Sequence, residues 1–314
     1  MPMRIASFTA YQATLANLQA RQQDLSNIQN QMTSGLRVQV ASDDPVAAAQ
    51  VVRAAAAQSR ITAQTTAANA SQTEMQQTDS ALGNASNLIL QARNLIVSAG
   101  NGSYTDSDRA NIASQLQGLQ TDLFSIANTS DGNGRYLFGG QGSDTAPFVQ
   151  GAAGAVSYVG SAGQQTAASS QPLPLTVDGN VWMNAADPNN PGSTISIFQS
   201  LQNTITALNT PGQSAAQIAT AVKQGLASLD AGSNQLAAAR ASVGAAENAV
   251  QTVTNQLSAG MLASQTQQSN AQDLDMTAAI SNFSTQQTGY QAALKTYSMI
   301  QQLSLFNYIS PSSS

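Results

Sequence analysis

The chain has 314 residues, only 9% of them charged, and its formal net charge is −5 at pH 7. Binding to nucleic acid is disfavoured because a nucleic-acid groove needs a basic patch. The chain contains neither cysteine nor histidine, which removes disulfides, thiol nucleophiles, imidazole bases and most zinc or copper sites. We therefore expect no metal, no cofactor and no catalytic residue.

No apolar run approaches the roughly 18 residues of a transmembrane helix. The N-terminus also lacks a continuous apolar stretch, since Gln and Asn interrupt its apolar residues, whereas a cleavable secretory signal keeps such a stretch unbroken. We expect no membrane partner. If the protein leaves the cell, it uses a route that does not depend on such a signal.

Residues 4–34 are predicted to form one helix, with Gly35 suited to a left-handed cap at its end. Its apolar residues alternate in steps of three and four, which keeps one seam facing a partner helix. Because the spacing holds for about four heptads, it favours an assembling coiled coil over an ordinary amphipathic helix. The seam consists of Phe8, Tyr11, Leu15, Leu18, Gln22, Leu25 and Met32, with Ile28 beside them.

Residues 276–309 carry a matching stripe at the other end of the chain. We predict that the two ends pair through these stripes, and that the pair is completed by neighbouring subunits. The second stripe consists of Met276, Ile280, Phe283, Gln287, Tyr290, Leu294, Tyr297, Ile300 and Leu303.

Two adjacent carboxylates, Asp43 and Asp44, precede Pro45. Asp44 is placed to cap a helix whose first residue is Pro45, a position that tolerates the missing N–H. Paired carboxylates also occur at metal and acid–base sites. No third ligand lies nearby in the sequence, so capping is the preferred interpretation.

The helices predicted next cover residues 46–99 and 105–126, joined by a Gly-rich link that favours an antiparallel hairpin. Thr105 and Asp108 form a capping-box pattern. Further helices are predicted at 196–208, 215–229 and 232–269. Each of the long helices carries an apolar or alanine stripe, which must be buried to stabilise helices with so few charges.

The run 128–140 changes character. Gly132 and Gly134 indicate a tight turn before Arg135, and the three residues from Tyr136 have strand character. A phosphate-binding loop is disfavoured because the spacing fits neither nucleotide motif and no lysine follows.

The segment 141–214 contains short strand-like pieces at 148–149, 156–159, 173–177 and 181–183. Asp178-Gly179-Asn180 is a hairpin signal between the last two. The lone Trp182 is interpreted as part of the core of this segment rather than as a ligand platform.

These elements predict a mainly α fold, a rod of long coiled-coil-like helices from both chain ends with a small inserted β-rich domain. We divide the chain into a terminal helical domain (1–40 and 272–314), a helical rod domain (41–140 and 215–271) and the insert (141–214). Both helical domains are discontinuous in sequence.

The chain resembles the flagellin-like structural proteins of the bacterial flagellum, and within them the hook-associated proteins of the hook–filament junction. Asp-Gly-Asn-Gly-Arg-Tyr-Leu-Phe-Gly-Gly at 131–140 is the motif that most separates the junction proteins from flagellin itself. We find no motif of the family in the insert, and it stays open whether Met1 or Met3 initiates the chain. The other matching residues lie at 3–5, 32–37, 42–45, 101–102, 108–109, 290–294 and 304–306.

The resemblance implies an axial structural protein, secreted through the flagellar type III apparatus, that forms a homo-oligomeric ring between hook and filament. It implies three partners: the other junction protein, FlgK, as proximal neighbour, flagellin as distal neighbour, and a cytoplasmic export chaperone, FlgN. The positions it marks as a structural signature are Gly35, Asp43, Asp44, Pro45, Gly132, Gly134, Arg135 and Tyr136.

Three alternatives to a junction subunit are a filament flagellin, a glycosidase and a binding module. A filament flagellin is disfavoured by the 131–140 motif and by the ending 273–309. A glycosidase site in the insert would need a carboxylate pair, such as Asp178 and Asp187, but Asp178 is better explained by its turn. A binding module on the insert remains open, since exposed inserts often contact outside partners.

Overall fold

The structure is a computed structural model that describes residues 2–142, 144–151, 154–167 and 171–309. Side chains are described for residue 9 and for residues 11–299 within those ranges. The chain forms two compact units. We call residues 1–60 and 260–314 the terminal unit and residues 61–259 the central unit; the division into three domains stays a prediction.

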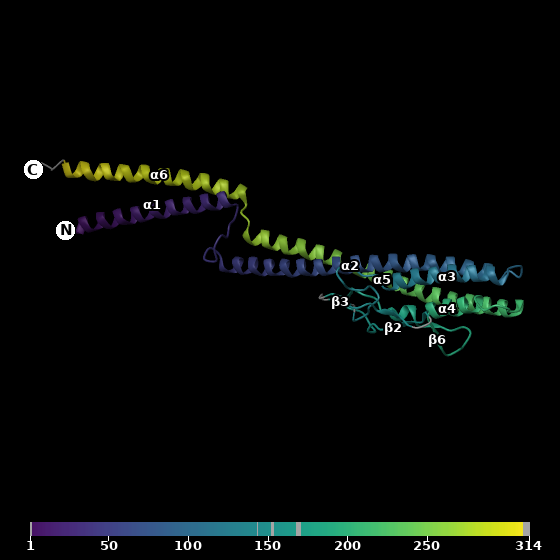
Figure 1. Cartoon of the computed structure of the whole chain (residues 1–314). Coiled ribbons are helices and arrows are strands. Elements are labelled where there is room, and N and C mark those ends of the chain that lie inside the picture. The colour runs from purple at the N-terminus through teal and green to yellow at the C-terminus, as the bar shows by residue number, and fades with distance from the viewer. Residues whose placement is uncertain (1, 143, 152–153, 168–170, 310–314) are drawn as a thin grey trace, which may run out of the picture. The chain divides into compact units, whose positions relative to one another are not determined.

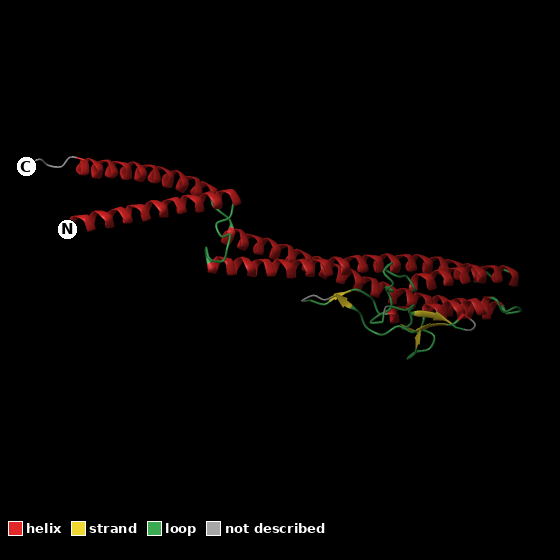
Figure 2. Cartoon of the chain, turned by 60° about the vertical axis from the view of Figure 1, so that its left-hand side comes forward, coloured by secondary structure: helices red, strands yellow, loops and turns green. Residues whose placement is uncertain are grey.

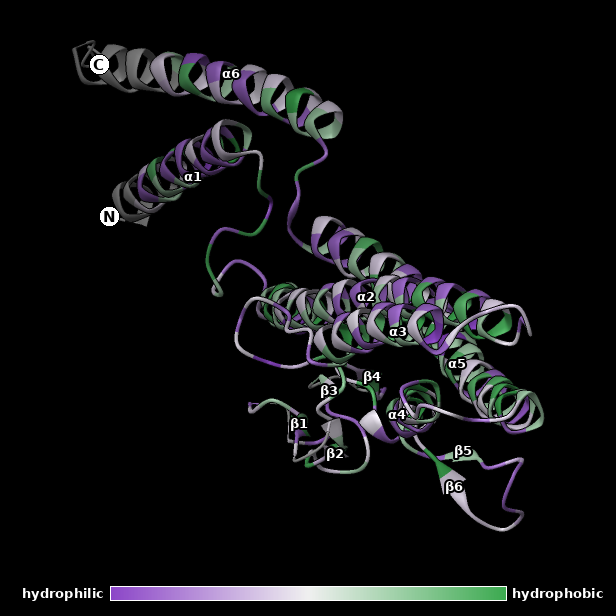
Figure 3. Cartoon of the chain, turned by 45° about the vertical axis from the view of Figure 1, so that its right-hand side comes forward, coloured by the Kyte–Doolittle hydropathy of each residue, from purple (hydrophilic) through white to green (hydrophobic). Residues whose placement is uncertain are grey.

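Long helices make up most of the chain, which confirms the mainly α fold with a small β-rich insert (Figures 1 and 2). Hydrophilic residues interrupt the hydrophobic ones along α1 and α6 (Figure 3), as expected of helices that bury one stripe. The helices are α1 (Pro2–Ser34), α2 (Pro45–Ala99), α3 (Asp106–Ala127), α4 (Ile197–Leu208), α5 (Ala215–Gln272) and α6 (Met276–Ile309).

The core of the central unit lies between α2, α3, α4, α5 and the insert. The stripe predicted on α2 is fully buried there, and it combines large residues such as Leu82 and Ile89 with alanines that let helices approach closely. The N-terminus of α3 has the predicted capping box: Thr105 accepts from the Asp108 N–H, and the Asp108 carboxylate accepts from the Thr105 N–H.

Helix α5 is one helix of 58 residues, so the break predicted near residue 231 is wrong. Gly232 lies inside this helix, directly beneath α4. A Cβ at Gly232 would come within 2.5 Å of the Ile197 side chain. Glycine therefore allows α4 to lie close to α5 here, and the helical hydrogen bonds continue through it.

Two reciprocal ion pairs join α2 and α5 within the central unit. Asp79 of α2 accepts two hydrogen bonds from Arg240 of α5, at 2.7 and 3.0 Å. Arg93 of α2 pairs with Asp230 of α5 at 3.0 Å. All four side chains are partly exposed, so each pair contributes at most about 1 kcal/mol, but together they distinguish one register of the two helices from its neighbours.

The insert consists of three separate antiparallel strand pairs. The pieces predicted at 148–149 and 156–159 pair as β1 and β2, whereas most of 173–177 is not strand. The strands are β1 (Phe148–Gln150), β2 (Val156–Tyr158), β3 (Thr166–Ala167), β4 (Leu173–Pro174), β5 (Ala185–Ala186) and β6 (Thr194–Ile195).

Two further strand predictions are wrong. The Asp178 carboxylate accepts from the Asn180 N–H and opens a 3₁₀ turn, η2 (Gly179–Trp182), in place of a hairpin. The run from Tyr136 turns back on itself, with the Gly139 N–H donating to the Tyr136 carbonyl. This turn buries both Leu137 and Phe138, which an extended strand would point in opposite directions.

Trp182 is fully buried, as predicted, and anchors the insert on the helices. Its ring stacks on Phe198 of α4 at a centroid distance of 6.0 Å and meets the edges of Phe138 and Phe148. Aromatic pairs of this geometry stabilise a core by about 0.5–1.5 kcal/mol beyond the area they bury.

A test of the insert's packing is Gly179→Ala. A Cβ at Gly179 would lie 2.3 Å from the Tyr158 ring and 2.6 Å from the Phe138 carbonyl oxygen, so we expect a loss of about 1–3 kcal/mol of unfolding free energy. Urea denaturation of the whole chain measures it. The matched control is Gly118→Ala on α3, where a Cβ meets nothing within 4 Å; it should raise stability by up to about 1 kcal/mol. Equal effects of the two substitutions would contradict the close packing.

Candidate assembly interface

The two chain ends pair, as the sequence predicts: α1 packs against α6 within the terminal unit. The rings of Tyr11 and Tyr297 lie 5.9 Å apart. A Cβ at Gly289 would come within 2.9 Å of the Arg21 guanidinium, and Leu36 forms a backbone bridge with Asp273. Residue numbers therefore rise on one helix as they fall on the other, so the pair is antiparallel.

Six of the thirteen predicted stripe positions whose side chains are described face the partner helix, in steps of seven. Leu18 is 7% exposed, and the other members of this set are half-buried. They are Leu18, Leu25 and Met32 on α1, and Phe283, Tyr290 and Tyr297 on α6.

The seam positions that lie between these heptad-spaced residues are shifted by one residue from the prediction. Residues immediately before the predicted ones on α6 face α1 instead, namely Ala279, Gln286 and Ala293. On α1, Thr14 is less exposed than Leu15, and Ile28 is half-buried. The sequence predicts the 3-4 alternation correctly. It does not show whether the step of three or the step of four comes first, and this order decides which residues enter the seam.

The shift leaves large apolar side chains beside the seam. Leu15 is 38%, Leu294 42% and Ile280 54% exposed. In heptad notation the seam is formed by a and d positions, and these three residues are e positions, as are Gln22 on α1 and Gln287 on α6. In an antiparallel pair the e positions of both helices line the same edge of the seam. We call Leu15, Gln22, Ile280, Gln287 and Leu294 the e flank.

The remaining predicted interface residues stand as follows. Tyr11 and Met276 lie in the pair but are 41% and 43% exposed. The side chains of Phe8, Ile300 and Leu303 lie outside the described residues, although their backbone is helical.

The connection between the paired helices and the rest of the terminal unit depends on residues 35–44. Gly35 has a φ of +72° and ends α1 in the predicted left-handed cap. The Arg37 N–H donates to the Gln272 carbonyl at 2.8 Å, and the Leu274 N–H donates to the Gly35 carbonyl at 3.0 Å. These bonds hold the end of α1 against the end of α5.

Arg37 has a role that the sequence analysis missed. Its guanidinium donates to the Ala271 carbonyl in the last turn of α5 and pairs with Asp44 at 3.1 Å. The only available signal was a basic residue between two predicted helices, since cations favour helix C-termini.

Asp43 and Asp44 both bind backbone N–H groups, which confirms the capping interpretation. Asp44 accepts from Val46 and Ala47 at 3.1 and 3.0 Å, with Pro45 opening α2. Asp43 accepts from the N–H groups of residues 39 and 40, each at 3.0 Å. The cap and the Arg37 contact lower the pKa of Asp44.

The other half of the signature forms a closed loop in the central unit. One Asp131 oxygen accepts from the N–H groups of Asn133 and Arg135, at 2.8 and 3.0 Å. The Asp131 N–H donates in return to the Arg135 carbonyl. Gly132 and Gly134 have positive φ angles of +79° and +91°, which favour glycine.

Arg135 joins two buried carboxylates. Its guanidinium lies 2.9 Å from Asp131 and 3.0 Å from Glu74 of α2, whose side chains are 1% and 7% exposed. Hydrogen bonds from the loop and from Arg135 lower the pKa of Asp131 to about 2, against the effect of burial. Burial, and then the neighbouring Asp131, raise the pKa of Glu74. The pairing of Glu74 with Arg135 was not foreseen, because 61 residues separate them.

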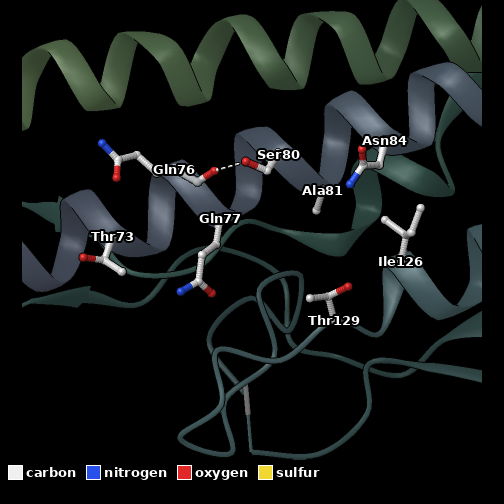
Figure 4. A pocket seen from close by; sticks show the side chains of 8 residues that line it. All are labelled: Thr73, Gln76, Gln77, Ser80, Ala81, Asn84, Ile126 and Thr129. Carbon is white, nitrogen blue, oxygen red and sulfur yellow. Dashed lines mark hydrogen bonds between the residues drawn. The ribbon is translucent and has the colours of Figure 1, made fainter.

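A shallow pocket of about 400 Å³ lies between α2 and the end of α3 (Figure 4). Amides and hydroxyls line much of it, from Gln76, Gln77 and Asn84 to Thr73 and Thr129. It contains no ionisable side chain and none of the predicted site residues, so its lining offers no acid, base or nucleophile activated by a base.

The two carboxylates considered for glycosidase chemistry bind backbone groups. Asp178 accepts from the N–H groups of Asn180 and Gly163 at 2.9 Å each, and Asp187 accepts from Asn189 at 2.9 Å. Within the described residues, no cluster of three or more acidic side chains could hold a metal ion. No helix of the described part is long and apolar enough to cross a membrane.

Comparison with known proteins shows which class of protein this chain belongs to. Residues 5–143 match the family model of the bacterial flagellin N-terminal helical region, and residues 226–309 match that of the bacterial flagellin C-terminal helical region. Both halves of the α1–α6 pair fall within these matches. The chain is therefore a flagellin-like protein at both ends.

Two curated relatives narrow the class. The chain is 34% identical to flagellar hook-associated protein 3 of Escherichia coli (strain K12), over 97% of this chain and 99% of the relative. It is 31% identical to flagellar hook-associated protein 3 of Salmonella typhimurium over the same shares. The chain belongs to the flagellar hook-associated protein 3 family.

Solved structures share the fold. A putative flagellar hook-associated protein from Vibrio parahaemolyticus matches with a TM-score of 0.64 at 18% identity, covering 74% of this chain and 100% of that one. FlgL of Xanthomonas campestris matches with a TM-score of 0.59 at 22% identity, covering 69% and 99%.

A test of the buried charge cluster uses pH. Asp131 stabilises the fold above its ordinary pKa of 3.8, and this contribution, about 2 kcal/mol, is lost as the pH falls towards 2. Glu74 has the opposite sign: its raised pKa means that stability falls as the pH rises from 4.5 through the pKa of the folded state. We expect Asp131→Asn to destabilise at neutral pH and Glu74→Gln to flatten the pH dependence above 4.5.

Urea denaturation at a series of pH values measures both effects. The matched control is Asp122→Asn on the exposed face of α3, which should change stability by no more than about 0.5 kcal/mol. A pH profile above 4.5 that Glu74→Gln leaves unchanged would contradict the raised pKa of the buried Glu74 carboxyl group.

Proposed function

We propose that the chain is a structural subunit of the bacterial flagellum at the hook–filament junction, incorporated when neighbouring subunits cover the e flank of its α1–α6 pair. Membership of the hook-associated protein 3 family supports the place in the flagellum. The exposed apolar residues beside the seam support the mode of incorporation.

The width of the apolar stripe is the observation that carries the proposal. A two-helix seam buries the a and d positions only, and here those positions already include two alanines on α6. The larger Leu15, Ile280 and Leu294 remain on one edge and expose apolar surface. Burying such surface stabilises by about 25 cal/mol per Å², so a helix of a neighbouring subunit that covers this edge gains what the isolated pair cannot.

The composition of the flank indicates what kind of helix fits it. No e position between residues 15 and 29 or between 280 and 294 is charged, so a charged partner surface would lose hydration without gaining an ion pair. By the antiparallel register, Leu15 lies level with Leu294 and Gln22 level with Gln287. Gln29 lies level with Ile280, so the three levels are apolar, polar and mixed. Differences of this kind between levels specify the register of a helical assembly. The helices at the ends of this chain have the same character, which supports a homo-oligomeric ring.

The proposed partners extend along the flagellar axis. We assign FlgK as the proximal neighbour, flagellin as the distal neighbour, and FlgN as the chaperone that holds the C-terminal region before type III export. The low charge and the lack of cysteine suit a chain exported unfolded. The proposed division into terminal domain, helical rod domain and insert assigns assembly to the first, and leaves the insert as a possible surface for outside partners.

The function is tested in a strain that lacks the gene. We expect hooks without filaments and flagellin released into the medium, and restoration of filaments by the wild-type chain. Normal filaments in the deletion strain would overturn the junction assignment and favour the alternative, a filament subunit.

The mode of incorporation is tested in the same strain with Leu294→Asp. An unpaired carboxylate on the e flank costs several kcal/mol when a neighbour covers it, so we expect the variant to be exported but not incorporated, with the central unit folded. Electron microscopy of flagella and circular dichroism of the purified chain measure the two parts. Ala292→Asp is the matched control and should be incorporated, because Ala292 is exposed and lies two residues from Leu294, on the opposite side of α6. Global unfolding of the Leu294 variant would instead favour a purely internal role.

Limited proteolysis of the isolated chain provides an independent prediction. Because the terminal helices lack the neighbours that bury their flank, they open at a lower free energy than the central unit. Mass spectrometry should identify early cuts within residues 1–40 and 272–314 and a surviving central fragment. Ends as resistant as the centre at low protein concentration would contradict an interface that neighbours complete.

A further inference from the structure

The chain contains two Asn-Gly pairs, Asn101-Gly102 and Asn133-Gly134, and the structure separates them. In an Asn-Gly pair the glycine backbone nitrogen can attack the asparagine side-chain carbon, because no Cβ obstructs its approach. Both pairs lie in exposed loops, so water has access to both. What differs is how each asparagine side chain is held.

The Asn101 side chain is engaged. Its Oδ1 accepts a hydrogen bond from the Ser103 N–H at 3.0 Å, forming a local turn. This bond holds the Asn101 side chain in one conformation, so its Cγ is less free to rotate towards the Gly102 nitrogen. Asn133 lies in the loop of residues 131–135, which we call the signature loop. In this loop, by contrast, the bonds to Asp131 use the backbone N–H groups of Asn133 and Arg135. Among the described contacts, none involves the Asn133 side chain or the Gly134 N–H.

We propose that Asn133 is a site of spontaneous, structure-controlled deamidation, and that its conversion opens the buried Glu74–Arg135–Asp131 cluster. The Gly134 nitrogen bonds to the Asn133 Cγ, the bond from Cγ to Nδ2 breaks, and the nitrogen leaves as ammonia. The Gly134 N–H proton leaves to solvent as the leaving group takes one up. Water then opens the five-membered imide at either carbonyl, giving aspartate or isoaspartate.

The consequence follows from the size of the loop. Isoaspartate adds a methylene to the backbone between the two N–H groups that share one Asp131 oxygen, so both bonds cannot keep their length. Either product also places a new carboxylate beside Asp131, whose own charge is already balanced by Arg135. Arg135 is then released from Glu74, which is left buried without its cation, an arrangement that destabilises the loop against α2.

The experiment follows the purified full-length chain in mildly alkaline buffer by peptide mapping, with mass spectrometry detecting conversion of amide to acid. We expect residue 133 to convert several-fold faster than residue 101. A short peptide of each loop sequence, incubated alongside, gives the rates without the fold. Conversion of Asn101 at an equal or higher rate in the folded chain would overturn the proposal, as would an Asn133 that stays intact while its peptide converts.

Trypsin tests the structural consequence, since Arg135 is itself a cleavage site. Aged wild-type chain should be cut after Arg135 several-fold faster than fresh chain. The control is Asn133→Gln, whose longer side chain does not close a five-membered ring, and its susceptibility should not change with age. Equal cleavage of aged and fresh wild-type chain after confirmed conversion would overturn the link between this site and the buried cluster.

Discussion

The antiparallel contact between α1 and α6 is the constraint on which the terminal unit depends. It joins residues from opposite ends of the chain, and its seam is closed by heptad-spaced residues such as Leu18 and Phe283. Loop closure over so long a chain costs conformational entropy. The connection at Gly35, Arg37 and Gln272 offsets part of that cost, because it fixes where both helices begin their pairing.

The central unit is stabilised differently. Its helices bury a continuous apolar core to which the insert is attached by Trp182 and the phenylalanines around it. The strongly buried charged side chains described there are those of Glu74 and Asp131, which both pair with the partly exposed Arg135, and that of Arg109. The signature loop thus combines positive-φ glycines, which set its shape, with the Asp131 carboxylate. The hydrogen bonds that hold the loop closed also lower the pKa of this carboxylate.

Much of this architecture follows from the sequence, because helical periodicity and capping are local. The stripes of α2 and α3, the cap at Asp44 and the capping box at Thr105 are determined by residues within one or two turns. The errors have non-local causes. Gly232 continues a helix because α4 lies over it, and the run from Tyr136 turns because the core accepts both Leu137 and Phe138. Thr14 faces the seam where Leu15 was predicted, because this choice depends on how far one helix is rotated about its axis relative to the other. The periodicity of the sequence does not determine that rotation.

The reciprocal pairs Arg93–Asp230 and Arg240–Asp79 have a mechanical consequence. Sliding α2 along α5 by a single helical turn, about 5.4 Å, would break both pairs in the same movement. Weak contacts that fail together resist shear far better than their equilibrium strengths suggest. Because the charges are partly exposed, salt screens them, so the force at which these two helices slip should depend on the ionic strength of the surrounding solution.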